Sequence, residues 1–150
     1  MGDPDNPEKV LRIGGEAGLL GILTPGRTAR ANAPALLLLN AGTVRRVGTR
    51  RLSVRLARRL AGHGFTSVRF DFAGLGDSPA RSGESSFMSG ACADVGAVMD
   101  YLEGRQGFHS FVLIGLCSGA DVGLAAARED ERVAGVVQLN PWVHKNRRYY

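Results

Sequence analysis

The stretch Gly115-Leu116-Cys117-Ser118-Gly119 places a cysteine between two glycines, after an apolar run and before a helix-like segment. In a G-x-nucleophile-x-G turn, the glycines permit a sharp, strained backbone and the close approach of neighbouring chain. The helix N-terminus then stabilises negative charge on the sulfur. The N–H of Ser118 is placed to donate to an oxyanion. Cys117 is therefore a candidate nucleophile, and the alternative is a cysteine that only fills a tight turn.

Ser118 is the other nucleophilic side chain in this turn. A turn centred on this serine would need glycine at positions 116 and 120, where the chain has Leu116 and Ala120. The pattern therefore favours Cys117 as the nucleophile and leaves Ser118 as an oxyanion donor.

A second set of candidate donors follows the apolar run at residues 35–40. In folds with a nucleophile turn, the loop after this strand supplies the second oxyanion N–H. Gly42 and Thr43 are both candidates, and the alternative is an ordinary glycine turn. Arg45, in the same loop, is a candidate for attracting an anionic acyl carrier or a carboxylate, with a plain surface charge as the alternative.

A nucleophile of this kind also needs a general base, and the chain has three histidines. His63 and His109 are predicted at the end of the sheet opposite Cys117. His144 follows the last strand, at the edge where ligands bind in parallel sheets. A Cys117–His144 dyad is one hypothesis. The other is that His144 is an exposed residue and that the acid and base lie outside this chain.

Strand-like and helix-like segments alternate along the chain, which predicts right-handed β-α-β crossovers in a mainly parallel sheet. The predicted strands are 10–14, 19–23, 35–40, 66–72, 110–115 and 132–140. The predicted helices are 49–64, 86–104 and 118–128. One face of the first helix is expected to carry Leu52, Leu56 and Leu60. One face of the second is expected to carry Met88, Cys92, Val95, Met99 and Leu102. The fold class is α/β, with about six strands flanked by helices.

The length of 150 residues suits one domain, predicted at residues 10–150 after a flexible tail at 1–9. The two cysteines, Cys92 and Cys117, do not have the spacing of a zinc site, and we expect no metal. The sequence contains neither an apolar run of membrane-spanning length nor the pattern of a signal peptide. We therefore expect a cytoplasmic protein without a membrane partner.

The formal net charge of +5 comes mainly from arginine, and seven arginines fall between Arg45 and Arg59 without an acidic residue. A basic patch can attract nucleic acid. However, neither a nucleic-acid motif nor interleaved aromatic residues accompany the run. We interpret it as a solvated helix face and expect no nucleic-acid partner.

Together these motifs resemble those of α/β-hydrolase-fold enzymes of the serine aminopeptidase-like type. The match rests on LLLLNAGTVRRVG, on the D-x-x-G-x-G-x-S pattern of DFAGLGDS, and on the GLCSGA turn. The chain is most similar to the subgroup that includes hydrolases associated with bacterial exosortase systems, whose turn often carries cysteine. The resemblance spans about residues 10–142. It implies hydrolysis of a small-molecule ester, thioester or amide, or acyl transfer, through an acyl-enzyme and without a cofactor.

The chain departs from this family after the nucleophile. The family order is nucleophile, acid and then histidine, but only 33 residues follow Cys117. We therefore expect a truncated α/β-hydrolase fold, the N-terminal portion of a longer or split hydrolase that a C-terminal segment complements. A homodimer that covers the open sheet edge is the second expectation. The alternative function is a non-catalytic half-domain that acts as a scaffold or partner-binding element.

Overall fold

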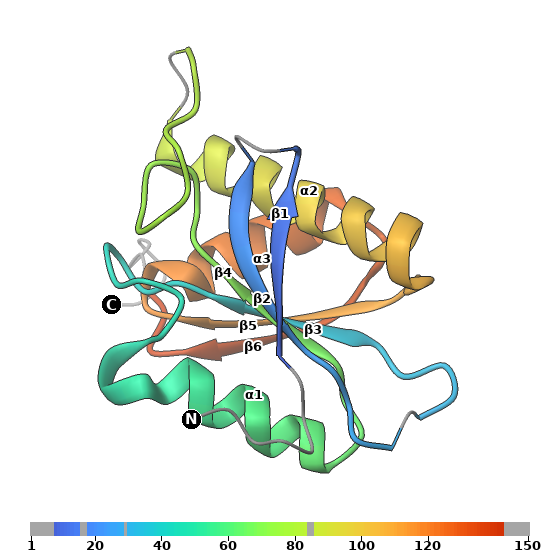
Figure 1. The fold of residues 1–150 in the computed structure, drawn as a ribbon. Helices are drawn as coiled ribbons and strands as arrows, with labels where there is room; N and C mark the ends of the chain where they lie inside the picture. The colour runs from blue at the N-terminus through green and yellow to red at the C-terminus, as the bar shows by residue number, and fades with distance from the viewer. Residues whose placement is uncertain (1–7, 16–17, 29, 84–85, 143–150) are drawn as a thin grey trace, which may run out of the picture.

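The structure is a computed structural model that describes residues 8–15, 18–28, 30–83 and 86–142. Its strands are β1 (Lys9–Ile13), β2 (Leu19–Thr24), β3 (Ala35–Leu39), β4 (Ser67–Phe70), β5 (Phe111–Leu116) and β6 (Val133–Leu139). Its helices are the short 3₁₀ turn η1 (Thr49–Arg51), α1 (Leu52–Gly62), α2 (Phe87–Gln106) and α3 (Ser118–Glu129) (Figure 1). Among the described helices, none is long and apolar enough to cross a membrane.

The strands form one six-stranded sheet in the order β1-β2-β4-β3-β5-β6. Strands β4, β3, β5 and β6 are parallel to one another, while β2 pairs antiparallel with both β1 and β4. Every residue of β3 is buried, as its continuous apolar sequence requires of a strand covered on both faces. The predicted fold class, a mainly parallel sheet flanked by helices, is confirmed.

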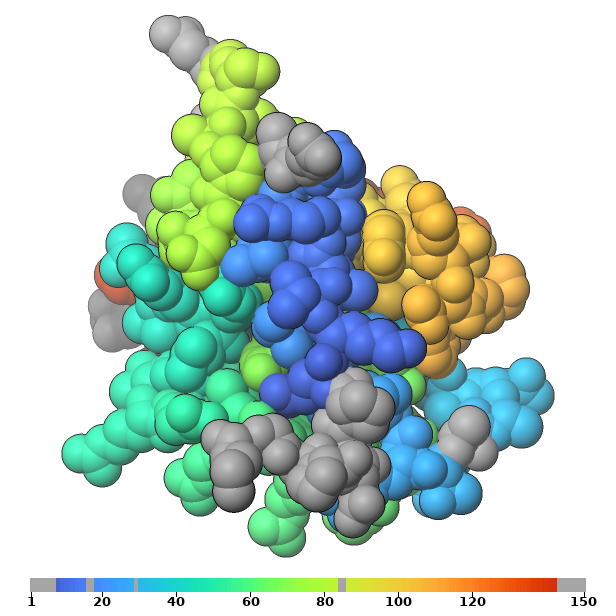
Figure 2. Space-filling model, in the orientation of Figure 1, coloured from blue at the N-terminus to red at the C-terminus, as the bar shows by residue number. Residues whose placement is uncertain are grey.

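The sheet has helices on both faces, with α1 on one side and α2 and α3 on the other (Figure 1). The main core cluster joins strand residues to α2 and α3, and includes Phe70, Phe72, Phe111, Met99 and Val122. In Figure 2 the β1–β2 hairpin, in blue, lies between α1 and α2 and closes the near side of the molecule. The sheet thus has two edge strands, β1 in this hairpin and β6 at the opposite end.

In the first two helices, the predicted apolar face coincides only partly with the face that is buried. The buried residues of α1 are Val54, Ala57 and Ala61. Leu52 is 43% exposed and the other two leucines of the predicted row are half-buried. These small residues let α1 approach the sheet closely, so the row of leucines lies to one side of the contact with the sheet. In α2 the prediction holds for Val95, Met99 and Leu102, whereas Met88 is exposed and Cys92 is half-buried.

The domain begins slightly earlier than predicted. Lys9 already belongs to β1, and the Glu8 carboxylate forms ion pairs with Arg58 at 3.0 Å and with Arg69 at 3.2 Å. The tail predicted at 1–9 therefore does not include residues 8 and 9. Residues 1–7 lie outside the described part of the chain.

Candidate active site

Cys117 occupies the sharp turn between the end of β5 and the start of α3. Its φ of 54° and ψ of −123° lie in a region that side-chain-bearing residues rarely adopt. The turn is held by the Cys117 N–H, which donates to the Leu139 carbonyl at 2.9 Å, and by the Cys117 carbonyl, which accepts from the Ala120 N–H at 2.9 Å. The residue is exposed. The chain thus presents a solvent-accessible thiol on a strained, well-anchored backbone.

The two glycines of the turn are required by close backbone approaches. A Cβ on Gly115 would lie 2.2 Å from the Gly119 carbonyl oxygen, so the strand and the helix meet there without room for a side chain. A Cβ on Gly119 would lie 2.4 Å from the Asn40 carbonyl oxygen. The first glycine therefore lets α3 fold back on β5, and the second lets α3 approach the loop after β3.

The candidate oxyanion donors of the two loops meet beside Cys117. The Gly42 N–H donates to Ser118 Oγ at 2.7 Å, across the gap between the β3 loop and the start of α3. Gly42 has a φ of +53°. Within the described ranges, the N–H groups of Ser118 and Thr43 have no acceptor. Gly42 is thus hydrogen-bonded to the first residue of α3, next to Cys117. Thr43 is the next residue of the loop and is exposed.

The loop that carries Gly42, residues 40–46, is anchored on the buried carboxylate of Asp71, at the end of β4. Asp71 Oδ1 accepts the backbone N–H of Arg46 at 2.6 Å and the side-chain amide of Asn40 at 3.4 Å. The Arg46 guanidinium pairs with Asp71 and, at 2.8 Å, with Asp77. The sequence alone did not identify this contact, for which the 71–78 motif was the available signal.

The same 71–78 motif forms a compact turn of its own. Asp71 Oδ2 accepts the Asp77 N–H at 3.2 Å, and the Ser78 hydroxyl donates to the Asp71 carbonyl at 2.6 Å. A Cβ on Gly76 would lie 2.3 Å from the Asp71 carboxylate. The hydrogen bond and the charge of Arg46 lower the pKa of Asp77. Gly76 thus leaves room for the buried Asp71 carboxylate, which accepts hydrogen bonds from the 40–46 loop and from the 71–78 turn.

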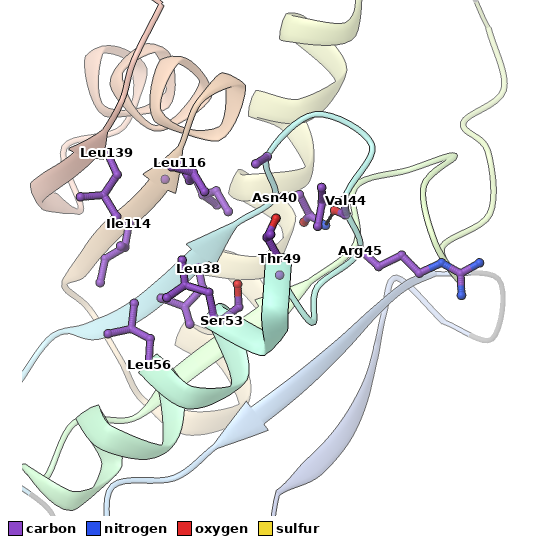
Figure 3. A pocket seen from close by; sticks show the side chains of 15 residues that line it. Leu38, Asn40, Val44, Arg45, Thr49, Ser53, Leu56, Ile114, Leu116 and Leu139 are labelled. Carbon is purple, nitrogen blue, oxygen red and sulfur yellow. Dashed lines mark hydrogen bonds between the residues drawn. The ribbon is translucent and has the colours of Figure 1, made fainter.

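A shallow apolar groove lies beside the loop, between α1 and the ends of β5 and β6 (Figure 3). Leu38, Leu56, Ile114, Leu116 and Leu139 point into it. The Arg45 side chain lines one end but extends away from the apolar side chains (Figure 3). Its predicted steering of an anionic substrate stays a prediction.

The described histidines do not approach Cys117. His63 follows α1 and His109 precedes β5, so both lie at the amino ends of the parallel strands, opposite the turn. His109 Nδ1 is 3.1 Å from Glu103 Oε1. His144, the predicted partner, lies outside the described residues. Asp121, in the first turn of α3, accepts the Trp142 N–H at 3.2 Å.

The second cysteine, Cys92, lies in a different environment from Cys117. Burial and then the charge of Glu129 raise the pKa of the half-buried Cys92 thiol. Across the described ranges, no three His, Cys, Asp or Glu side chains gather as a metal site would require. Because Cys117 is exposed and Cys92 is half-buried, Cys117 is the more accessible of the two thiols.

Comparisons with known proteins agree with this architecture. The sequence model of the family described as "Serine aminopeptidase, S33" matches residues 34–149. The fold is similar to that of the α/β hydrolase GrgF from Penicillium sp. sh18, with a TM-score of 0.73 and 22% identity over 91% of this chain. It is also similar to the Pyrococcus furiosus esterase Pf2001, with a TM-score of 0.71 and 20% identity over 88% of this chain. A comparison with curated protein sequences found no match.

The chain spans about half the length of these structures, 46% of GrgF and 51% of the esterase. The family match covers most of the sequence and includes the 40–46 loop, the 71–78 motif and the nucleophile turn. The family is named for serine, whereas this turn carries cysteine. The matched residues and the fold show that the chain belongs to the S33 serine aminopeptidase family of α/β hydrolases.

Proposed function

We propose that the protein is a hydrolase or acyl transferase that acts on an ester, thioester or amide through Cys117. The observation that carries the proposal is the backbone of Cys117, exposed at φ 54° and ψ −123° between β5 and α3. A strained conformation at an accessible nucleophile, close to the backbone N–H groups of Ser118 and Gly42, supports a role in acyl transfer.

The proposed first step is attack of the Cys117 thiolate on the carbonyl carbon of a small-molecule acyl substrate. The carbon–sulfur bond forms, and the carbonyl electrons move to oxygen to give an oxyanion. The N–H groups of Ser118 and Gly42 stabilise it, with Gly42 exchanging its present bond to Ser118 Oγ for the stronger anionic acceptor. Collapse breaks the bond between the carbonyl carbon and the leaving group and leaves a thioester on Cys117. The leaving group takes up the proton that the thiol gave to the base or to water when it became the thiolate.

The proposed second step is attack on this thioester by water, which gives hydrolysis, or by another nucleophile, which gives acyl transfer. Both routes need a base to remove a proton from the attacking group. We propose His144 or a complementing C-terminal segment as its source, because the two described histidines lie at the opposite end of the strands. A homodimer that covers the open sheet edge remains a further proposal.

The test uses p-nitrophenyl acetate and the pure 150-residue protein at neutral pH. A burst of p-nitrophenolate of about one per chain, absent in Cys117→Ala, is the expected result. Turnover after the burst that His144→Ala removes would assign the base within this chain. A burst without turnover would assign it elsewhere. A burst of equal size in Cys117→Ala would rule out Cys117 as the nucleophile.

A second candidate function, a scaffold or partner-binding half-domain, rests on a different observation. On the face of the sheet where α1 packs, the part that α1 does not cover carries a row of apolar side chains, which we call the apolar strip. Its members are Leu52, Leu56, Ile114, Leu116, Val137 and Leu139. Exposed contiguous apolar surface is typical of an interaction site. Binding of a partner that Cys117→Ala leaves unchanged and Val137→Lys abolishes would favour this function.

A further inference from the structure

Both ends of the 40–46 loop are attached to one buried carboxylate. Asp71 is fully buried, and its Oδ1 accepts the side-chain amide of Asn40, at the start of the loop, and the backbone N–H of Arg46, at its end. The same Asn40 amide donates to the Val44 carbonyl at 2.6 Å. The loop is thereby closed into a narrow arch.

Gly42 lies at the crest of this arch. The Val44 N–H donates to the Ala41 carbonyl at 3.0 Å, which makes a turn with Gly42 and Thr43 at its centre. The direction of the Gly42 N–H, now toward Ser118 Oγ at 2.7 Å, depends on where the two ends of the arch are held. An error of about 1 Å in such a donor has a large effect on rate.

Arg46 couples the buried carboxylate to the surface. Its guanidinium contacts Asp71 and Asp77 together, and its side chain is only 17% exposed. Burial alone acts to lower the pKa of Arg46, but the hydrogen bonds and charges of Asp77 and Asp71 outweigh it and raise that pKa. The guanidinium therefore stays charged and compensates the buried carboxylate, which would otherwise be costly.

We propose that Asp71 and Arg46 are positioning residues that hold the oxyanion loop, so that the Gly42 N–H faces the carbonyl oxygen of a substrate acylating Cys117. This inference rests on the proposed function. The two residues would contact neither the substrate nor the thiol, but would determine where the Gly42 N–H points.

The test compares two reactions of the same thiol. Acylation by p-nitrophenyl acetate passes through an oxyanion, whereas alkylation by iodoacetamide does not. Arg46→Ala is expected to slow acylation about tenfold or more, less than the 100-fold to 1,000-fold typical of losing an oxyanion donor outright. It is expected to leave alkylation within about twofold of the wild-type rate, because the thiol's own environment is unchanged.

Two further variants sharpen the comparison. Arg46→Lys keeps the charge but not the two-pronged contact, so an intermediate acylation rate is expected. Arg59→Ala removes an exposed arginine of α1 as the matched control and is expected to leave both rates unchanged. An unchanged ratio of acylation to alkylation in Arg46→Ala, including a parallel fall of both rates, would overturn the positioning role.

Hydrogen–deuterium exchange separates this inference from the proposed function. In Arg46→Ala, exchange is expected to quicken in a peptide covering residues 40–48 and to stay the same in one covering β5. Failure of p-nitrophenyl acetate to acylate the wild-type protein would defeat the proposed function. Whatever the outcome of acylation, unchanged exchange in residues 40–48 of Arg46→Ala would overturn the positioning role. Faster exchange there would support the hold of Arg46 and Asp71 on the 40–46 loop.

Discussion

At the scale of single residues, the turn between β5 and α3 depends on two glycines and one strained cysteine. Gly115 and Gly119 leave no room for a Cβ, because backbone oxygens lie 2.2 and 2.4 Å from where it would be. Both oxygens belong to backbone held by neighbouring elements, so they cannot move aside as a flexible side chain would. The position of Cys117 is thus determined by backbone contacts on both sides.

Gly119→Ala is therefore expected to lower the free energy of unfolding by about 1–3 kcal/mol, the usual cost of overpacking. Gly96→Ala is the matched control, because the space around Gly96 in α2 is open. This control is expected to raise the free energy of unfolding by about 0.5–1 kcal/mol, since alanine favours helix. Urea unfolding of the two variants provides the measurement. Equal stabilities would show that the close approach at Gly119 is not a constraint.

The two thiols are expected to react at different rates. Burial and the charge of Glu129 raise the pKa of Cys92, so little of it is thiolate at pH 7, while Cys117 is exposed. Iodoacetamide at pH 7 should label Cys117 first, and peptide mapping by mass spectrometry at short times will show the order. Faster labelling of Cys92 would contradict the assigned environments.

At the scale of elements, the sequence predicted all six strands to within two residues of their observed bounds, because each is a short apolar run between turn residues. It did not predict which face of α1 packs on the sheet. That helix has apolar residues on two sides, and periodicity alone cannot say which side meets the sheet. The small residues Val54, Ala57 and Ala61 do so, because they permit close packing.

For the candidate site, the sequence likewise predicted local backbone but not contacts between distant residues. The spacing of glycines around Cys117 predicted the turn, because local sequence determines that backbone. The sequence left Gly42 and Thr43 as alternative donors, because residue types do not reveal the direction of individual N–H groups. The Arg46–Asp71 contact joins residues 25 positions apart and could be found only from the folded chain.

The start of β1 is coupled to α1 and β4 by the carboxylate of Glu8. Burial acts to raise the pKa of Glu8, but the hydrogen bond from Arg58 and the charges of Arg69 and Arg58 outweigh it and lower that pKa. A lowered pKa in the folded state adds stability that is complete above the unfolded pKa and is lost as the pH falls through the folded value.

The free energy of unfolding should therefore decrease below about pH 4.5, the ordinary value for this carboxyl. Glu8→Gln should flatten this decrease. At pH 7 the same variant should cost about 2 kcal/mol, because the buried Arg69 loses its charged partner. Urea unfolding at several pH values measures both effects. An identical pH profile in Glu8→Gln would contradict the assigned ion pairs.

At the scale of the whole molecule, the two edge strands of the sheet are β1, in the β1–β2 hairpin, and β6. The register between β5 and β6 pairs Ile114 with Val137 and Leu116 with Leu139, which puts these four side chains on the face that α1 only partly covers. The apolar strip is thus continuous with the edge strand β6. The chain spans about half of the structures it resembles, and partners for this region are proposals.

The apolar strip should bind the fluorescent dye 1-anilinonaphthalene-8-sulfonate in the native state, because such dyes report exposed apolar surface. Val137→Lys should reduce the fluorescence at least twofold by placing a charge in the strip. Leu124→Lys, at an exposed leucine of α3 outside the strip, is the control and should change it little. Equal fluorescence of the two variants would show that the strip is not a binding surface.

The most direct test of the central claim is the location of the acyl group after reaction with p-nitrophenyl acetate. The protein is quenched in acid within the burst phase and mapped by peptide mass spectrometry. We expect one acetyl group per chain, on Cys117, with Cys92 and Ser118 unmodified. Acetyl groups spread over other residues, or their undiminished presence in Cys117→Ala, would contradict it.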